Sequence, residues 1–432
     1  MDTQQLILNR NPFAAPTEEA IGADFIGRKS VLKEMHKYVI NADKISNYHI
    51  VGLPRIGKSS LLKAFKAMVL ENHYSHDLVV FYISLDECNS PNDMWRIIGK
   101  GIRKELKKQF RSCDKYTNFI DELEFEDVDE NKIDYEYVCS VARCMKASGF
   151  LGLILIDEFD NFSTIATKGT VGQVRTLFSG SEFGLRAVVA SRRMVERIEK
   201  EVEGALNSNV SILAPTFING YKLKAFNEDD MKDYWATVEE KIGVAVSSKY
   251  KEEVNYYVGT HPCLLNLLNG SLWAEKETKD YICDDVSNLK LSEELINKLH
   301  DSFNWAVWRD MEKWQLLRSL ILSTWGPDDE ILNSELSELE RYGIIDKSQF
   351  LSESSGPIRI AISRYFTEWM NLKRYVLPFG DEWSKAEGNM RKIVKCFCDD
   401  MYQGYESKMM SHLEIKYANT LEKNTDPRFT AK

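Results

Sequence analysis

One eight-residue stretch carries residue types suited to phosphate binding. Residues 52–59 read Gly-Leu-Pro-Arg-Ile-Gly-Lys-Ser and match the pattern G-x-x-x-x-G-K-[ST]. Gly52 and Gly57 let the loop curl so that backbone N–H groups point at phosphate oxygens, and the helix that follows adds its positive dipole end. Lys58 would reach the β- and γ-phosphates, and the Ser59 hydroxyl would ligate Mg²⁺. A chance glycine turn fits less well, because a predicted strand precedes the loop and a predicted helix follows it.

Two neighbouring acids supply the second half of such a site. Asp157 and Glu158 follow the apolar residues 153–156, and ligands bind at the carboxyl ends of strands in open α/β sheets. Asp157 would hold Mg²⁺ directly or through water, and Glu158 would orient and deprotonate the attacking water. Acids often end strands without any such role. Downstream of a phosphate loop, however, this pair favours nucleotide hydrolysis.

Two arginines end a further apolar run. Arg192 and Arg193 follow the predicted strand Leu185–Ser191. A cationic group in that position could sense the γ-phosphate, or could act on the nucleotide of a neighbouring subunit. Arginines that only cap a strand in solvent fit the sequence equally well. The candidate catalytic residues are therefore Glu158, Lys58, Arg192 and Arg193.

The elements that must position these residues are strands of a parallel sheet. Residues 77–86, 151–157 and 185–191 form nearly continuous apolar runs of strand length, and a shorter run, 48–52, leads into the phosphate loop. Helical patterns separate the runs, and a parallel sheet covered on both faces requires this combination. Buried helices fit poorly because each run is short and ends in polar residues. We therefore predict an α/β P-loop NTPase core with a helix-covered parallel sheet.

The sequence beyond this core changes to helical patterns. Asn227 is the expected N-cap of the first lid helix. Further on, two helical patterns lead to short strand patterns at 344–346 and 358–362, which together predict a winged helix. We expect the tail to be partly helical and to bind a partner. The expected lead-in, ATPase core, helical lid, winged-helix domain and tail are residues 1–24, 25–225, 226–300, 301–378 and 379–432.

Composition excludes several other classes of protein. The 432 residues are 44% apolar and 11% aromatic, too apolar for a disordered or fibrous chain. The formal net charge of −10 disfavours a protein that coats nucleic acid. No apolar run approaches the roughly 18 residues of a membrane helix, and the N-terminus lacks a signal-peptide pattern. The eight cysteines show neither zinc-site nor disulfide spacing. We expect a cytoplasmic protein without membrane contact.

Six motifs in a fixed order carry a resemblance to a known family. They are residues 11–13 (Asn-Pro-Phe), 25–28 (Phe-Ile-Gly-Arg), 52–59, 157–158, 191–193 and 259–265 (Gly-Thr-His-Pro-Cys-Leu-Leu). In this order they resemble the STAND NTPases, the signal-transduction branch of the AAA+ class. The resemblance covers about residues 11–370 and implies a helical lid and a winged helix after the ATPase core.

The resemblance also implies roles for individual residues. Residues 25–28 would line the adenine site, Pro262 would pack on the base, and His261 would lie near the phosphates or at the lid contact. A histidine satisfied within the core remains the alternative for His261. The residues expected to contact ATP or ADP are Gly52, Pro54, Arg55, Ile56, Gly57, Lys58, Ser59, Ser60, Phe25, Ile26, Gly27, Arg28, His261 and Pro262. The expected Mg²⁺ ligands are Ser59 and Asp157.

The function implied is that of a molecular switch. ATP would be bound and slowly hydrolysed, and the nucleotide state would control self-association. Many STAND proteins carry an effector domain before the ATPase and a sensor after the winged helix. This sequence shows neither, so we expect a separate effector or sensor protein as partner. For bacterial members the resemblance implies a role in defence against phage.

Two other functions compete with this hypothesis. The first is a DNA-binding AAA+ ATPase of the replication-initiator or transposition-regulator type. Its recognition helix would be residues 334–342, where glutamates outnumber the single arginine, and this argues against contact with DNA phosphates. The second is a scaffold that keeps ATP or ADP as a structural ligand and does not hydrolyse it.

Overall fold

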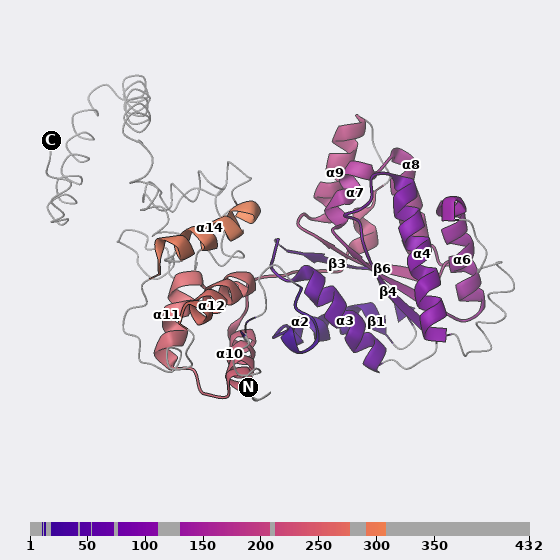
Figure 1. Ribbon diagram of the computed structural model, residues 1–432. Coiled ribbons are helices and arrows are strands. Elements are labelled where there is room, and N and C mark those ends of the chain that lie inside the picture. Colours follow the sequence, from indigo (N-terminus) through magenta and orange to yellow (C-terminus); the bar gives the residue numbers. More distant parts are fainter. Residues whose placement is uncertain are drawn as a thin grey trace, which may run out of the picture. The chain divides into compact units, whose positions relative to one another are not determined.

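The computed structural model describes most of the ATPase core and of the predicted lid (Figure 1). All described residues lie within one of two compact units, Met1–Thr367. The predicted winged helix from residue 308 on, its strands, residues 334–342 and the tail lie outside the described residues. The described residues are 11, 13, 19–41, 44–52, 54–72, 77–110, 130–207, 212–276 and 291–307.

A five-stranded parallel sheet forms the centre of the core, in the strand order β4-β5-β6-β3-β7. Its strands are β3 (Tyr48–Val51), β4 (Leu78–Ser84), β5 (Leu151–Asp157), β6 (Leu185–Ser191) and β7 (Gly220–Lys222). The first four follow the predicted apolar runs. Strand β7 was not predicted, because its three residues include no aliphatic side chain that could indicate a buried strand. A separate antiparallel pair joins β1 (Ile40–Asn41) to β2 (Lys44–Ile45).

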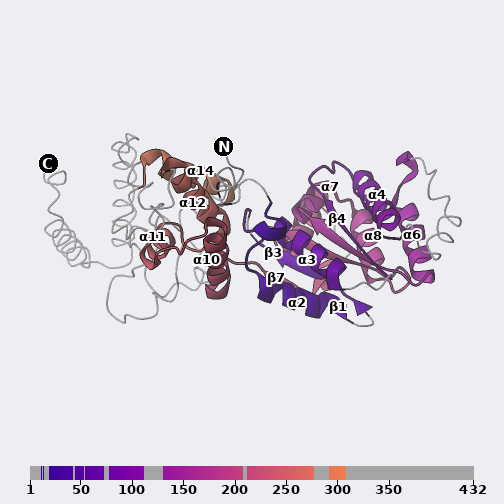
Figure 2. The ribbon, with the colours of Figure 1, turned by 60° about the horizontal axis from the view of Figure 1, so that its bottom comes forward.

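Helices cover both faces of the sheet (Figures 1 and 2). Side chains of β5 alternate between two hydrophobic cores: Ile154 and Ile156 pack on the side of α4, α6, α8 and α9, and Leu153 and Leu155 on the side of α2 and α3. The predicted helix-covered parallel sheet is therefore confirmed. The core helices are α2 (Lys29–Val39), α3 (Lys58–Asn72), α4 (Pro91–Phe110), α6 (Tyr135–Ala147), α7 (Phe162–Ile165), α8 (Lys168–Ser179) and α9 (Val195–Leu206). Short 3-10 turns are η1 (Gly22–Asp24), η2 (Glu130–Lys132), η3 (Phe159–Asn161) and η4 (Ala214–Phe217).

Most of the described residues after β7 lie in helices, and a lid formed by these helices stays a prediction. Asn227 caps the first of them through a capping box with Asp230, which confirms the predicted N-cap. The Tyr250 hydroxyl donates to Asn269 Oδ1 (2.8 Å), and Asn269 Nδ2 donates to the Tyr234 hydroxyl (3.0 Å), so buried polar groups tie three helices together. The helices are α10 (Glu228–Ile242), α11 (Ser248–Val258), α12 (Pro262–Lys276) and α14 (Glu293–Val307), and α14 continues across residue 300.

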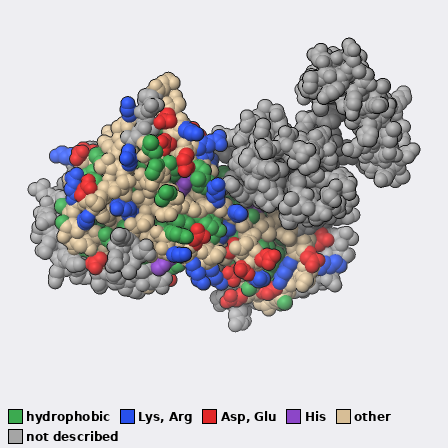
Figure 3. All heavy atoms as spheres, turned by 180° about the vertical axis from the view of Figure 1, so that it is seen from behind, with side chains coloured by type: hydrophobic (Ala, Val, Ile, Leu, Met, Phe, Trp, Pro, Cys, Tyr) green, Lys and Arg blue, Asp and Glu red, His purple; other side chains and the backbone are tan. Residues whose placement is uncertain are grey.

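On the face drawn in Figure 3, Lys and Arg side chains are interspersed with Asp and Glu side chains. None of the helices in the described part of the chain is both long enough and apolar enough to span a bilayer.

Candidate functional site

The parallel register brings the predicted site segments to one edge of the sheet. The phosphate loop follows β3, Asp157 is the last residue of β5, and Ser191 is the last residue of β6. The Gly52 N–H donates to the Ser191 carbonyl (3.0 Å), which joins the start of the loop to the end of β6. Because the carboxyl ends of parallel strands share one edge, residues far apart in sequence meet there.

The loop between β3 and α3 needs glycine at two positions. A Cβ on Gly52 would come within 2.8 Å of Ile56 Cγ2 and 3.1 Å of Leu223 Cβ. Gly57 has φ +96°, a conformation that L side chains rarely adopt. Helix α3 then begins at Lys58. A strand, a glycine loop and a helix opening with Lys-Ser are the arrangement of the P-loop NTPases, and the fold is of this type.

Lys58 is buried beside the acidic side chains of the sheet edge. Only 5% of the residue is exposed. Burial lowers the pKa of the Lys58 ammonium, although Glu158, Asp157 and Asp160 act in the opposite direction. Carboxylates near a buried ammonium favour its charged form and so offset part of the effect of burial. A lysine held in this way is available to a further anion, such as a phosphate.

Asp157 is held by two hydrogen bonds. Its carboxyl is buried, with the residue 2% exposed. The Tyr82 hydroxyl donates to Oδ2 (2.8 Å), and the Glu158 N–H donates to Oδ1 (2.9 Å). Each oxygen keeps a further lone pair for a ligand. Asp157 and the half-buried Ser59 therefore offer oxygen donors, the kind that Mg²⁺ prefers.

Glu158 combines an unusual backbone with a perturbed carboxyl. Its φ of +49° lies in the left-handed region. Non-glycine residues rarely adopt this conformation, and those that do are often found at functional sites. Burial raises the pKa of Glu158, and Lys58 and Arg192 oppose that rise. The Oε2 atom lies 3.4 Å from the Arg192 guanidinium. A half-buried carboxylate with a raised pKa is suited to accept a proton.

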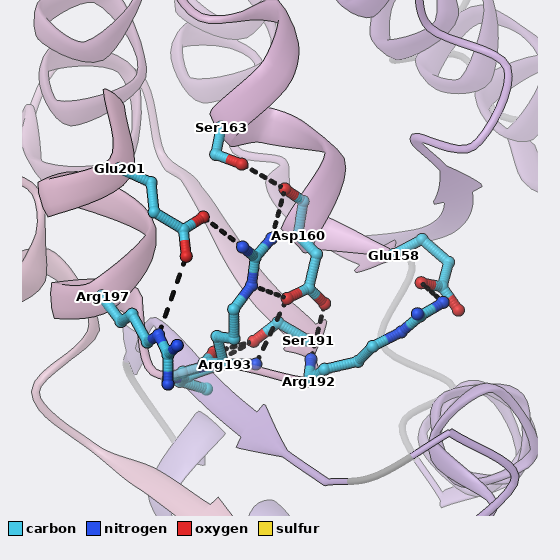
Figure 4. Close-up of polar contacts among 9 residues, drawn as sticks. Glu158, Asp160, Ser163, Ser191, Arg192, Arg193, Arg197 and Glu201 are labelled. Carbon is cyan, nitrogen blue, oxygen red and sulfur yellow. Dashed lines mark hydrogen bonds and ion pairs between the residues drawn. The ribbon is translucent and has the colours of Figure 1, made fainter. Parts of the chain in front are cut away.

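The two predicted arginines face different acids of their own chain (Figure 4). Arg192 points toward Glu158, whereas Arg193 points toward Asp160 and Glu201. The Arg193 Nε donates to Asp160 Oδ1 (2.8 Å), and a second guanidinium nitrogen pairs with Glu201. Arg192 is thus the arginine that approaches the predicted base, and Arg193 is engaged in two ion pairs.

Arg28 joins the segment 25–28 to both the phosphate loop and helix α10. Its backbone N–H donates to Asp230 Oδ1 (2.6 Å). Its guanidinium lies 3.7 Å from Asp230 Oδ2, donates to the Ile56 carbonyl (3.4 Å), and lies 4.7 Å from the centre of the Phe226 ring. Burial lowers the pKa of Arg28 to about 10. Phe25 and Ile26 are half-buried beside it in sequence.

The segment that begins α12 approaches the same place. His261 is 1% exposed, and burial followed by the charges of Arg28 and Arg55 lowers its pKa to about 3, so the ring is neutral at neutral pH. Burial raises the pKa of the Cys263 thiol, and the charge of Arg55 and a hydrogen bond with it oppose that rise. Pro262 is half-buried. His261 and Cys263 therefore lie near Arg28 and near Arg55 of the phosphate loop, and the adenine-site roles of these residues stay predictions.

Ser60 has a partner in the N-terminal segment. Its hydroxyl accepts a hydrogen bond from the Ala20 N–H (3.0 Å), and Lys63, one turn further along α3, pairs with Glu19. Earlier in the chain, Asn11 donates to the Gly270 carbonyl of α12 (3.0 Å). The lead-in predicted for residues 1–24 thus contacts both α3 and the lid.

Sequence reasoning missed four residues of this region. Asp160 lies three residues after Asp157, so its acidic type was a usable signal. Asp230 could have been noticed as the third helical residue after the N-cap Asn227. Nothing in the sequence marked Tyr82 or His49, because their partners, Asp157 and Ser191, lie on other strands.

The buried Arg28–Asp230 pair yields a stability prediction. Asp230→Ala leaves the N–H of Arg28 without its acceptor and the guanidinium without the opposite charge of Asp230, and breaking a buried pair from one side costs about 3–5 kcal/mol. We expect urea denaturation, followed by tryptophan fluorescence, to show a loss of that size. Asp229→Ala is the matched control, because Asp229 is 89% exposed and pairs with Lys232 in the same helix. It should change stability by less than about 1 kcal/mol. Equal losses in both variants would contradict a structural role for the buried pair.

Comparisons with known proteins found similar solved structures at low identity. A Walker-type ATPase of Pyrococcus abyssi is 13% identical, with 81% of this chain and 97% of that chain covered and a TM-score of 0.47. The ORC2 protein of Aeropyrum pernix, solved as ADPNP–ADP complexes, is 12% identical, with 74% and 85% covered and a TM-score of 0.42. Domain III of the Thermotoga maritima replication initiation protein DnaA is 16% identical, with 64% and 94% covered and a TM-score of 0.38. No family model matches the chain, and no curated protein matches it.

Proposed function

We propose that this chain binds ATP with Mg²⁺ at the carboxyl edge of the sheet and hydrolyses it slowly, as a switch. One observation carries the proposal: Lys58, at the end of a glycine loop and the start of α3, is buried beside Asp157, Glu158 and Asp160. A buried cation among carboxylates, next to helix N–H groups, suits a ligand that brings both phosphate and a metal ion.

The residues present fit Mg²⁺ held together with a phosphate. Ser59 and Asp157 would hold the ion, which would neutralise charge on the phosphates. Among the residues that the structure describes, no group of three or more His, Cys, Asp or Glu side chains could hold a metal alone. Mg²⁺ usually binds through one or two carboxylates together with substrate phosphates and water.

Glu158 would accept the proton of the attacking water. Its carboxylate lies 3.4 Å from Arg192, and this ion pair opposes proton uptake, because a neighbouring cation favours the charged form of an acid. Hydrolysis would speed up once Arg192 turned from Glu158 toward the γ-phosphate. Slow turnover suits a switch, which must remain in one nucleotide state long enough to be read.

The contacts of Arg28 support a link between nucleotide and lid. Its guanidinium touches the phosphate loop at Ile56 and the lid helix at Asp230, so a change in the loop alters a lid contact directly. Moving a two-state switch from 1:99 to 99:1 needs about 5.5 kcal/mol of differential affinity. We propose that ATP and a protein partner supply this together, in a STAND-type switch whose ATP state favours self-association and engages a separate effector, with a role in defence against phage.

Nucleotide binding is tested by thermal unfolding with increasing Mg·ATP. We expect saturable stabilisation, which at 100 times the dissociation constant amounts to about 2.7 kcal/mol. Hydrolysis, followed by phosphate release, should stop when EDTA removes Mg²⁺ and return when Mg²⁺ is added in excess. An unchanged unfolding curve at millimolar ATP would contradict the proposal. A parallel titration with duplex DNA tests the competing function, for which affinity should fall steeply with salt.

A further inference from the structure

The turn at residues 191–193 is held from the side of the acidic loop. Asp160, in η3, is 8% exposed. Its Oδ2 accepts from the Arg192 N–H (2.5 Å), and its Oδ1 accepts from the Arg193 N–H (3.2 Å) and from Arg193 Nε (2.8 Å). Figure 4 shows these bonds converging on one carboxylate. Two successive backbone N–H groups on one carboxylate fix the orientation of the turn, and with it the direction of the Arg192 side chain.

The same turn is held from the side of the P-loop strand. His49, in β3, is 2% exposed, and its Nε2 lies 2.7 Å from Ser191 Oγ. The Ser191 hydroxyl donates its single proton to the Arg193 carbonyl (2.5 Å). His49 must therefore donate to Ser191, so its ring carries a proton on Nε2. Burial lowers the pKa of His49 to about 4, and the charge of Asp160 opposes this, so the ring is neutral at neutral pH.

These two anchors lie beneath the long and partly exposed side chain of Arg192. The Arg192 side chain is 46% exposed, and its guanidinium lies 3.4 Å from Glu158 Oε2. An exposed arginine loses much rotamer entropy when it is held in one place. A fixed backbone beneath it reduces the number of orientations that must be given up when the guanidinium contacts the γ-phosphate.

We propose that Asp160 and His49 are positioning residues for ATP hydrolysis, which together hold the 191–193 turn so that Arg192 can turn from Glu158 toward the γ-phosphate. This inference rests on the proposed function. The two arginines then have different roles: Arg193 anchors the turn through Asp160, and Arg192 acts at the nucleotide. It also connects β3, which leads into the phosphate loop, to the end of β6 through one imidazole.

The first test replaces the charged anchor. Asp160→Asn keeps the shape of the side chain but turns one acceptor oxygen into a donor that faces N–H groups. We expect kcat for ATP hydrolysis to fall on the order of 10- to 100-fold, as small misplacements of catalytic groups do, with the dissociation constant for a fluorescent ATP analogue within about threefold. Glu201→Gln is the matched control, because Glu201 pairs with the Arg193 and Arg197 guanidinium groups and accepts no N–H of the turn.

The second test uses the neutral anchor and keeps the inference falsifiable if Asp160→Asn does not fold. His49→Leu removes the donor to Ser191, whereas the amide nitrogen of His49→Gln can take about the place of Nε2. We expect His49→Leu to lose kcat with unchanged ATP affinity, and His49→Gln to recover most of the rate. Thermal unfolding of each variant reports stability separately.

The outcomes separate the inference from the function on which it rests. Wild-type chain that neither binds nor hydrolyses ATP defeats both. Wild-type turnover together with unchanged kcat in Asp160→Asn and His49→Leu defeats the positioning roles alone. The inference is also overturned if the losses of kcat only follow the losses of stability. In that case His49→Gln would be no more active than His49→Leu, or Glu201→Gln would be as impaired as Asp160→Asn, and Asp160 and His49 would be structural residues alone.

Discussion

Lys58→Ala is expected to weaken ATP binding by about 100-fold or more, which corresponds to about 2.7 kcal/mol. Lys58 is the buried cation at the point where the loop becomes α3, and the carboxylates of Asp157 and Glu158 lie near it. Without the ammonium, a triphosphate would approach these carboxylates with no charge to balance the repulsion. The loss therefore falls on binding itself, and titration with a fluorescent ATP analogue at fixed Mg²⁺ measures it.

The variant should keep its fold, because the acids beside Lys58 have other partners. Asp157 accepts from Tyr82 and from the backbone, and Glu158 pairs with Arg192. Lys66→Ala provides the control: Lys66 lies on the same helix and pairs with Glu105 at 2.9 Å, so its loss changes charge equally without touching the site. ATP affinity in Lys58→Ala equal to that of Lys66→Ala would remove the phosphate-loop assignment.

The sequence predicted the central strands because burial on both faces leaves a continuous apolar run. The predicted strands 151–157 and 185–191 match β5 and β6 residue for residue. The edge strand β7 escaped because a three-residue strand of Gly, Tyr and Lys need not be apolar. The N-cap at Asn227 was predictable, since capping depends on residues three apart in the chain.

The contacts that complete the site were beyond the sequence, because they depend on strand order and register. Tyr82 reaches Asp157 because β4 lies beside β5, and His49 reaches Ser191 because β3 lies beside β6. The pairing of β3 with β6 does not follow from the order of the strands along the chain, because β4 and β5 come between them. Arg28 and Asp230 lie 202 residues apart in the sequence, so their pairing depends on how α10 packs beside residues 25–28. Motifs thus indicated the chemistry, and topology decided which residues support it.

Glu158→Gln is expected to reduce ATP turnover by about 10²–10⁴-fold while ATP still binds. Glutamine keeps the size of the side chain but cannot accept the proton of the attacking water. The phosphate contacts expected of Lys58, Ser59 and the loop are untouched, so affinity should hold or increase, because one negative charge near the phosphates is gone. The lost ion pair with Arg192 is 3.4 Å long and partly exposed, so its removal should cost less than about 1 kcal/mol of stability.

Single-turnover hydrolysis and ATP-analogue titration, run side by side, separate these effects. Glu196→Gln, an exposed glutamate in the first turn of α9, removes the same charge away from the site and should hydrolyse ATP at the wild-type rate. Because Glu158→Gln retains ATP, it should also accumulate the ATP state of the switch, and light scattering after gel filtration would then report any self-association that this state favours. Turnover at the wild-type rate in Glu158→Gln would show that another group accepts the proton, and the slow step would then have to be sought away from the Glu158–Arg192 pair.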